Sequence, residues 1–135
     1  MSKEKLSNLV SVLALVLAIA HILAMKFNLY FTVWWFDIPI HLLGGLWAGM
    51  FAVYYYTVTN QHIVGHVPPK KLFIIVISGV LIVGFSWEAF EYFSGYTFTT
   101  KSNYITDTII DIVFDIIGGI TAWLLVKENG YLNLK

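Results

Sequence analysis

The stretch Tyr104–Val126 reads YITDTIIDIVFDIIGGITAWLLV, and it determines the class of protein to which the chain is assigned. Its length matches the about 20 residues that a helix needs to cross the roughly 30 Å hydrocarbon core of a bilayer. Asp107, Asp111 and Asp115 interrupt it at intervals of four residues, so on a helix they share one face. A carboxylate in hydrocarbon costs at least about 2.5–3.5 kcal/mol and therefore usually faces a protein interior. The stretch predicts a transmembrane helix with a polar inward face.

Three further apolar stretches of similar length precede it, at residues 6–30, 38–58 and 71–93. The chain is 59% hydrophobic and 12% charged, whereas soluble domains carry about 25% charged residues. We therefore expect an all-α, multi-pass protein of the cell membrane, in which residues 1–135 form one compact bundle of four transmembrane helices. The first stretch is too long for a signal-peptide core and no small-residue cleavage site follows it, so we keep it as mature structure.

The composition also limits the partners and ligands. The chain has no cysteine, which excludes disulfides and thiolate metal sites. It has no basic stripe, so we expect no nucleic-acid partner. The lipid bilayer is the expected environment. A homo-oligomer is compatible with four spans, since four helices bury limited surface among themselves.

The lysines predict the orientation of the spans. Lysine-rich short loops stay cytoplasmic, and six of the eight lysines fall in the two terminal segments and the central connection: Lys3, Lys5, Lys70, Lys71, Lys127 and Lys135. Lys26 and Lys101 belong to the opposite side. Both termini are therefore expected in the cytoplasm. In that topology six carboxylates lie in the outer half of the bilayer, namely Asp37, Glu88, Glu91, Asp107, Asp111 and Asp115. His21 lies at a similar depth.

These polar residues are spaced three or four positions apart, so that pairs of them lie on the same face of a helix. Asp37 and His41 are four residues apart, and Glu88 and Glu91 are three apart, so each pair shares a face. The chain has no arginine, and its lysines lie outside the apolar stretches or at their ends. If the carboxylates converge, their counter-charge must come from protons or a bound cation. Glycines at positions 44, 45, 49, 118 and 119 would let the second and fourth spans pack closely and bring His41 toward Asp111.

Carboxylates with one or two histidines suit a divalent ion such as Mg²⁺, Mn²⁺, Fe²⁺ or Zn²⁺. We expect one or two ions, with Asp107 or Asp115 acting as catalytic base or supporting the ligands. The expected metal ligands are Asp37, His41, Glu88, Glu91 and Asp111. The alternative is a set of protonated carboxyl groups hydrogen-bonded to threonine, tyrosine and the backbone.

Simpler roles exist for several of these residues. Asp37 can cap the second helix ahead of Pro39, and Asp107 can favour the positive end of the fourth helix dipole. His21 can be a hydrogen-bonded interior histidine rather than a ligand. His62 and His66 also have helical spacing, but a solvated loop beside Pro68–Pro69 is the simpler interpretation.

The chain resembles small bacterial and archaeal membrane proteins of the YjdF type at Asp37–Gly45, Trp87–Tyr92 and Asp107–Gly119. It is more distantly similar to VanZ-like proteins. Those families share the order Asp-x-x-x-His, then Glu, then Asp-x-x-x-Asp-x-x-Gly. The resemblance implies a shared polar site at Asp37, His41, Glu88, Glu91, Asp111 and Asp115, without naming a reaction. This chain is shorter than the YjdF type and has fewer predicted spans.

The functional hypothesis is a membrane protein with a divalent-metal site, acting as a hydrolase or transferase on a lipid-like substrate. In such an enzyme the metal activates water or polarises a phosphoryl or ester oxygen. No nucleophile motif or phosphate-binding glycine loop is present, so enzyme status stays open. Two alternatives belong to other classes: a cation or proton pathway along Asp107, Asp111 and Asp115, and an accessory subunit whose acids meet a partner's basic helix.

Overall fold

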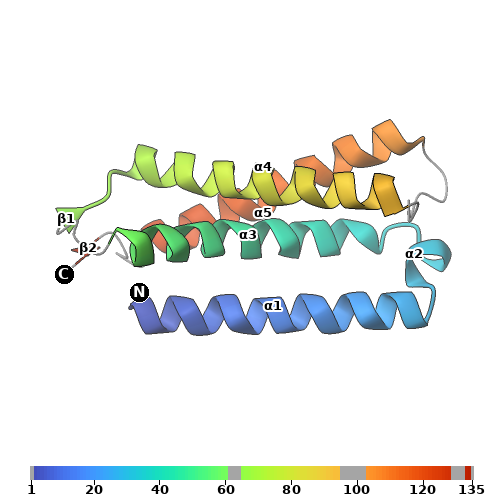
Figure 1. Cartoon of the computed structure of the whole chain (residues 1–135), viewed down its shortest axis with the longest axis horizontal. Coiled ribbons are helices and arrows are strands. Elements are labelled where there is room, and N and C mark those ends of the chain that lie inside the picture. The colour runs from blue at the N-terminus through green and yellow to red at the C-terminus, as the bar shows by residue number, and fades with distance from the viewer. Residues whose placement is uncertain (1, 61–64, 95–102, 129–132, 135) are drawn as a thin grey trace.

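The computed structural model of the chain describes residues 2–60, 65–94, 103–128 and 133–134. Four of its helices are long and apolar enough to cross a membrane: α1 (Lys3–Lys26), α3 (Asp37–Thr59), α4 (Pro69–Ser94) and α5 (Tyr104–Glu128). A short helix, α2 (Leu29–Thr32), follows α1, and two two-residue strands, β1 (Gly65–His66) and β2 (Asn133–Leu134), pair antiparallel. The all-α, four-span prediction is confirmed (Figure 1). His62 and Lys101 lie outside the described residues.

The first span ends earlier than the sequence suggests. We expected it to continue to Tyr30, but α1 stops at Lys26 and Asn28 adopts a left-handed conformation with φ 53°. Asparagine tolerates that conformation better than most residues, and it cannot continue a right-handed helix. The turn lets α2 fold back toward α1, where Tyr30 is buried against Ala24.

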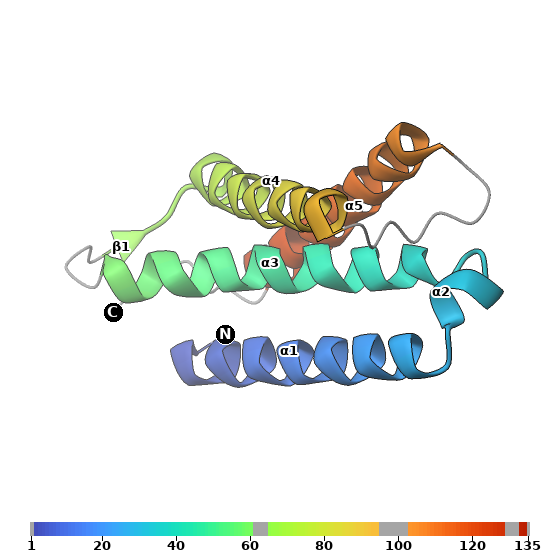
Figure 2. The same ribbon diagram turned by 45° about the vertical axis from the view of Figure 1, so that its right-hand side comes forward.

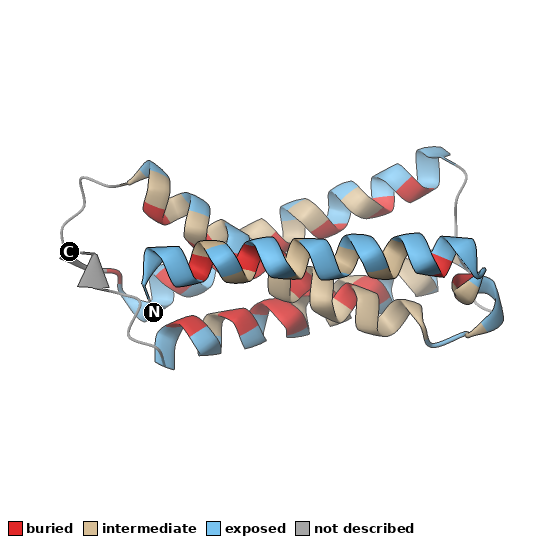
Figure 3. Ribbon diagram, turned by 90° about the horizontal axis from the view of Figure 1, so that it is seen from below, coloured by how far each residue is buried: buried red, intermediate tan, exposed pale blue. Residues whose placement is uncertain are grey.

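The helices α3, α4 and α5 pack against one another, and α1 lies along α3 (Figures 1 and 2). The end of the bundle opposite α2 has an apolar core, which includes Met50, Val53, Leu72 and Val126. Exposed residues cover most of α1 (Figure 3). In a membrane this apolar surface faces lipid, so its exposure carries no cost in hydration.

Glycines set the distance between α3 and α5. A Cβ atom on Gly45 would collide with the backbone carbonyl of Asp115, and one on Gly118 would collide with that of Leu42. Backbones this close require glycine, as in other small-residue contacts between membrane helices. The predicted close packing of the second and fourth spans is confirmed, and it brings His41 next to Asp111.

The two ends of the bundle differ in chemistry. Lys3 of α1 and Glu128 of α5 lie at the end that holds β1 and β2 (Figure 1). The pairing of Gly65 with Leu134 ties the last residues of the chain to the connection after α3. The described carboxylates other than Glu4 and Glu128 lie toward the other end, where α2 joins α1 to α3. We call this the α2 end. Which end faces the cytoplasm stays a prediction from the lysines.

Candidate metal centre

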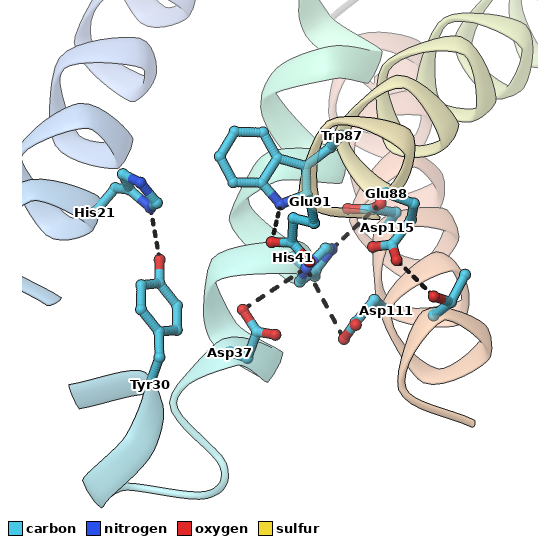
Figure 4. Close-up of polar contacts among 10 residues, drawn as sticks. His21, Tyr30, Asp37, His41, Trp87, Glu88, Glu91, Asp111 and Asp115 are labelled. Carbon is cyan, nitrogen blue, oxygen red and sulfur yellow. Dashed lines mark hydrogen bonds and ion pairs between the residues drawn. The ribbon is translucent and has the colours of Figure 1, made fainter. Parts of the chain in front are cut away.

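His41 lies at the centre of the polar cluster at the α2 end, and its side chain is 5% exposed. Its Nε2 atom lies 3.7 Å from Asp37 Oδ1 and 3.9 Å from Asp111 Oδ1. Its other ring nitrogen, Nδ1, lies 3.5 Å from Asp115 Oδ2. Figure 4 shows these carboxylates around the imidazole. Both ring nitrogens of His41 thus face acidic side chains.

Two helices build this arrangement from simple periodicity. Asp37 precedes His41 by one turn of α3, and Asp111 precedes Asp115 by one turn of α5. Residues four apart lie on the same helix face, so α5 presents two carboxylates to the ring at once. Gly84 of α4 lies against the Asp115 side chain, since a Cβ atom there would lie 2.7 Å from Asp115 Oδ2.

The charges in the cluster are unbalanced within the described residues. Asp111 and Asp115 are buried, at 3% and 5% exposure. The chain has no arginine, and the described lysines all lie at or near helix ends. One imidazolium cannot offset three carboxylates, and an unpaired buried charge is strongly destabilising. The cluster therefore needs protons or a cation to be stable.

The donor atoms are spaced closely enough for a metal ion. One ligand atom from each of Asp37, His41 and Asp111 lies within 4.8 Å of the others. Ligands at about 2.0–2.1 Å in a tetrahedral zinc site are separated by about 3.4 Å. The 3.7 and 3.9 Å distances from His41 Nε2 exceed that separation by a few tenths of an ångström, which small side-chain rotations can close. These three residues fit a divalent ion.

The two glutamates of α4 make hydrogen bonds at the edge of this group. Glu91 Oε1 accepts from Trp87 Nε1 at 2.7 Å, and Glu88 Oε2 accepts from the Thr108 hydroxyl at 2.6 Å. Both glutamates are buried. Glu88 Oε1 is buried and has no hydrogen-bond partner among the described residues. Both glutamates thus point into the bundle, in agreement with their predicted position on one helix face.

The sequence analysis missed the groups that hold these glutamates. Trp87 could have been found, because it precedes Glu91 by one helical turn. Thr108 bonds a residue 20 positions away, and the Tyr104 hydroxyl donates to the Glu88 carbonyl oxygen at 2.9 Å. No spacing rule predicts such contacts between helices.

Asp37 and Asp107 lie in the first turns of their helices. Asp37 is the first residue of α3 rather than its N-cap, which is Phe36. At the start of α5, the Asn103 side chain accepts from the Thr106 backbone N–H at 2.9 Å, so that cap does not depend on Asp107. Asp107 itself is half-buried in the first turn of α5.

His21 lies apart from the three-residue group. Its Nδ1 atom and the Tyr30 hydroxyl are 2.8 Å apart, and its ring meets Trp87 edge-on at 5.5 Å between centroids. Burial raises the pKa of the Tyr30 hydroxyl, and the nearby charges of Asp37 and Glu91 raise it further. Tyr30 therefore stays protonated at neutral pH and can donate to His21. This agrees with a hydrogen-bonded interior histidine.

Comparison with known protein families identifies the group to which the chain belongs. Residues 1–128 match the family described as "Predicted membrane protein (DUF2238)". No curated protein and no solved structure matches the chain significantly. The matched region contains all four apolar helices and every residue of the cluster. The chain therefore belongs to the DUF2238 family of predicted membrane proteins.

Proposed function

We propose that this membrane protein binds one divalent metal ion through Asp37, His41 and Asp111. The observation that carries the proposal is the state of His41 Nε2. This atom is buried, has no hydrogen-bond partner among the described residues and faces two carboxylate oxygens. Asp115 supports the assignment, since a carboxylate on the far nitrogen of a metal-bound histidine orients the ring and raises its basicity.

The donor set favours particular metals. Imidazole nitrogen suits Zn²⁺, Fe²⁺ and similar transition metals, whereas Ca²⁺ and Mg²⁺ prefer oxygen ligands alone. One nitrogen and two carboxylates therefore favour Zn²⁺, Fe²⁺ or Mn²⁺ over Mg²⁺. Glu88 keeps one unpartnered oxygen among the described residues and lies outside the three-residue group, so it would serve as a fourth ligand only after its side chain turns toward the ion. Glu91 would support the site through its hydrogen bond to Trp87.

We further propose that the site is that of a metal-dependent hydrolase or transferase for a lipid-like substrate. An ion held there would polarise a phosphoryl or ester oxygen or activate water. Asp107, half-buried at the outer edge of the cluster, would take up the proton, and Asp115 would keep the His41 ring in place. The resemblance to YjdF-type and VanZ-like proteins belongs to this proposal, because it implies the same polar residues.

The alternative of a cation or proton pathway finds less support. Beyond Asp115, the buried residues of α5 are Gly118, Gly119, Ala122 and Val126. Among the described residues of the other helices at that level, the buried polar group is Thr57, whose hydroxyl bonds the Tyr54 carbonyl. The acidic series thus meets an apolar core. An accessory subunit that docks a basic helix is the remaining alternative.

Metal content tests the proposal. The protein would be purified in detergent, incubated with Zn²⁺, Mn²⁺ or Fe²⁺, desalted and assayed by elemental analysis. His41→Ala and Asp111→Asn should each lose most of the bound metal, because each removes a ligand, while circular dichroism stays helical.

His21→Ala is the matched control, since it removes an imidazole at similar depth outside the three-residue group, and it should keep its metal. A wild-type protein that binds none of these ions would refute the proposal. Unchanged metal in both ligand variants would move the site elsewhere, with His62 and His66 next to be tested.

A further inference from the structure

An apolar cavity adjoins the polar cluster. It has a volume of about 290 Å³ and lies between α1, α3 and α4. His41 and Asp115 belong to its wall, and most of the remaining wall is apolar, including Leu17, Ala48 and Val83. The cavity and the candidate metal centre thus share two residues.

The cavity extends from the polar cluster toward the apolar end of the bundle. On α3 it runs from Ile40 to Ala48, and on α4 from Val80 to Trp87. At 1.5 Å per residue, the α4 wall is about 10 Å long. His41 lies toward the α2 end of this space. Asp115 meets it near the middle, beside Gly44 and Gly84. Mostly hydrocarbon side chains line the part that leads on from there.

The cavity lies at the seam between α1 and α4, two helices that make few contacts with each other. The helix α1 packs against α3. The His21 ring of α1 contacts the Trp87 ring of α4 at the α2 end of the cavity. The α1 wall is formed by Leu17, Ala18 and His21, and Ala18 is exposed. A small, exposed residue at this seam would give lipid a way into the cavity from the side.

We propose that this cavity binds one hydrocarbon chain of a bilayer phospholipid, with the polar end of the lipid at His41 and Asp115. An apolar cavity does not hold water stably, and at this depth in a membrane the surrounding medium is hydrocarbon. The volume is just below the about 300–1,000 Å³ of typical small-molecule pockets, so it suits part of one chain rather than a whole lipid. The proposal rests on the proposed function in one respect: if the metal ion is bound, the polar end of the lipid would meet it.

The orientation of such a lipid agrees with the geometry. With both termini in the cytoplasm, the polar cluster lies toward the outer leaflet and the apolar end of the cavity toward the bilayer centre. A phospholipid of the outer leaflet has the same arrangement, with its head group outward and its chains inward. Head group and chain would each meet the part of the site that matches their polarity.

Photo-crosslinking in vesicles tests the proposal. The protein would be reconstituted in phosphatidylcholine and phosphatidylglycerol with a trace of phosphatidylcholine that carries a diazirine at the end of one acyl chain. After irradiation, mass spectrometry should find label on the cavity residues Ala48 and Val80, although they are only 2% and 1% exposed. Ile82, which is 68% exposed on the outer face of α4, faces bulk lipid and calibrates the labelling.

Two variants fill the cavity from opposite walls. Val83→Phe and Ala18→Phe should each reduce labelling of the cavity residues about tenfold, the loss expected from about 1.4 kcal/mol of overpacking. Ile82→Phe adds the same ring to the lipid-facing side of α4, next to Val83, and should leave labelling unchanged. A parallel arm with a diazirine fatty acid distinguishes the source, since stronger labelling by the phospholipid supports a bilayer lipid.

Cavity residues that stay unlabelled while Ile82 is labelled, or cavity labelling that resists both filling variants, would overturn the proposal. Metal content, measured on the same samples, separates the two proposals. A wild-type protein with bound metal and an unlabelled cavity would refute only the lipid site. A labelled cavity in protein that binds no metal would refute only the metal site and would leave the lipid site supported.

Discussion

At the scale of single residues, His41 is the group on which the polar cluster depends. Its ring has a carboxylate on each side, with Asp115 at Nδ1 and with Asp37 and Asp111 near Nε2. The two nitrogens therefore have different roles: one is held in place by a hydrogen-bond acceptor, and the other faces the proposed ion. This division of roles is common for histidines that bind metals.

We predict that Asp115→Asn weakens metal binding without removing a ligand. The change keeps the shape of the side chain but removes the charge behind the ring, so metal affinity should fall about 10–100-fold. Competition with a chelator of known affinity measures this loss. Glu128→Gln, which removes an exposed carboxylate at the end of α5, should bind metal like the wild type. Equal affinity in Asp115→Asn would show that Asp115 does not support the site.

At the scale of elements, the contact between α3 and α5 determines the geometry of the cluster. Neither helix carries the group alone, because Asp37 and His41 come from α3 and Asp111 and Asp115 from α5. Their backbones approach until only glycine fits at Gly45 and Gly118. A side chain in that contact would separate the helices and move Asp111 away from His41.

Adjacent glycines on α3 test this contact. In Gly45→Ala the new Cβ atom would collide with the Asp115 backbone, whereas in Gly44→Ala it would lie 3.6 Å from Asp115 Oδ1, an ordinary contact. Both substitutions gain helix propensity, so their difference isolates the steric effect. We expect Gly45→Ala to lower the free energy of unfolding by about 1–3 kcal/mol relative to Gly44→Ala. It should also bind less metal.

Thermal unfolding in detergent and elemental analysis measure the two effects. Equal melting temperatures and equal metal contents for the two alanine variants would contradict the assigned role of the α3–α5 contact.

At the scale of the whole molecule, the interior of the bundle is apolar toward one end and polar toward the other. Lys3, Glu128 and the β1–β2 pair lie at the end with the apolar interior (Figure 1). The candidate metal centre lies toward the α2 end. In a membrane, the orientation of the bundle therefore decides which side of the cell supplies the ion and any polar substrate.

We predict that tags fused to either terminus are cytoplasmic, because lysines favour that side by six to two. Accessibility of the tags to protease or to an impermeant reagent in intact cells measures the orientation. A tag inserted after Lys101 is the control for the opposite side and should be accessible. A terminal tag that is accessible in intact cells would reverse the topology and move the polar cluster to the cytoplasmic leaflet.

Much of this architecture follows from the sequence by itself. Apolar length determines the four spans, and four-residue spacing puts Asp37 with His41 and Asp111 with Asp115 on shared faces. The glycines were enough to predict that the second and fourth spans meet. These features are local, since they depend on helical periodicity and on the size of single side chains.

The tertiary structure decided which acidic residues lie near each ring nitrogen of His41. Periodicity does not determine the rotation or depth of one helix relative to another, so it could not predict that Asp115 meets Nδ1 while Asp37 and Asp111 lie near Nε2. It also could not predict the hydrogen bond from Thr108 to Glu88. The cavity between α1, α3 and α4 depends in the same way on how α1 packs. These features arise from contacts between residues distant in the chain, which are set when the helix backbones reach their closest approach.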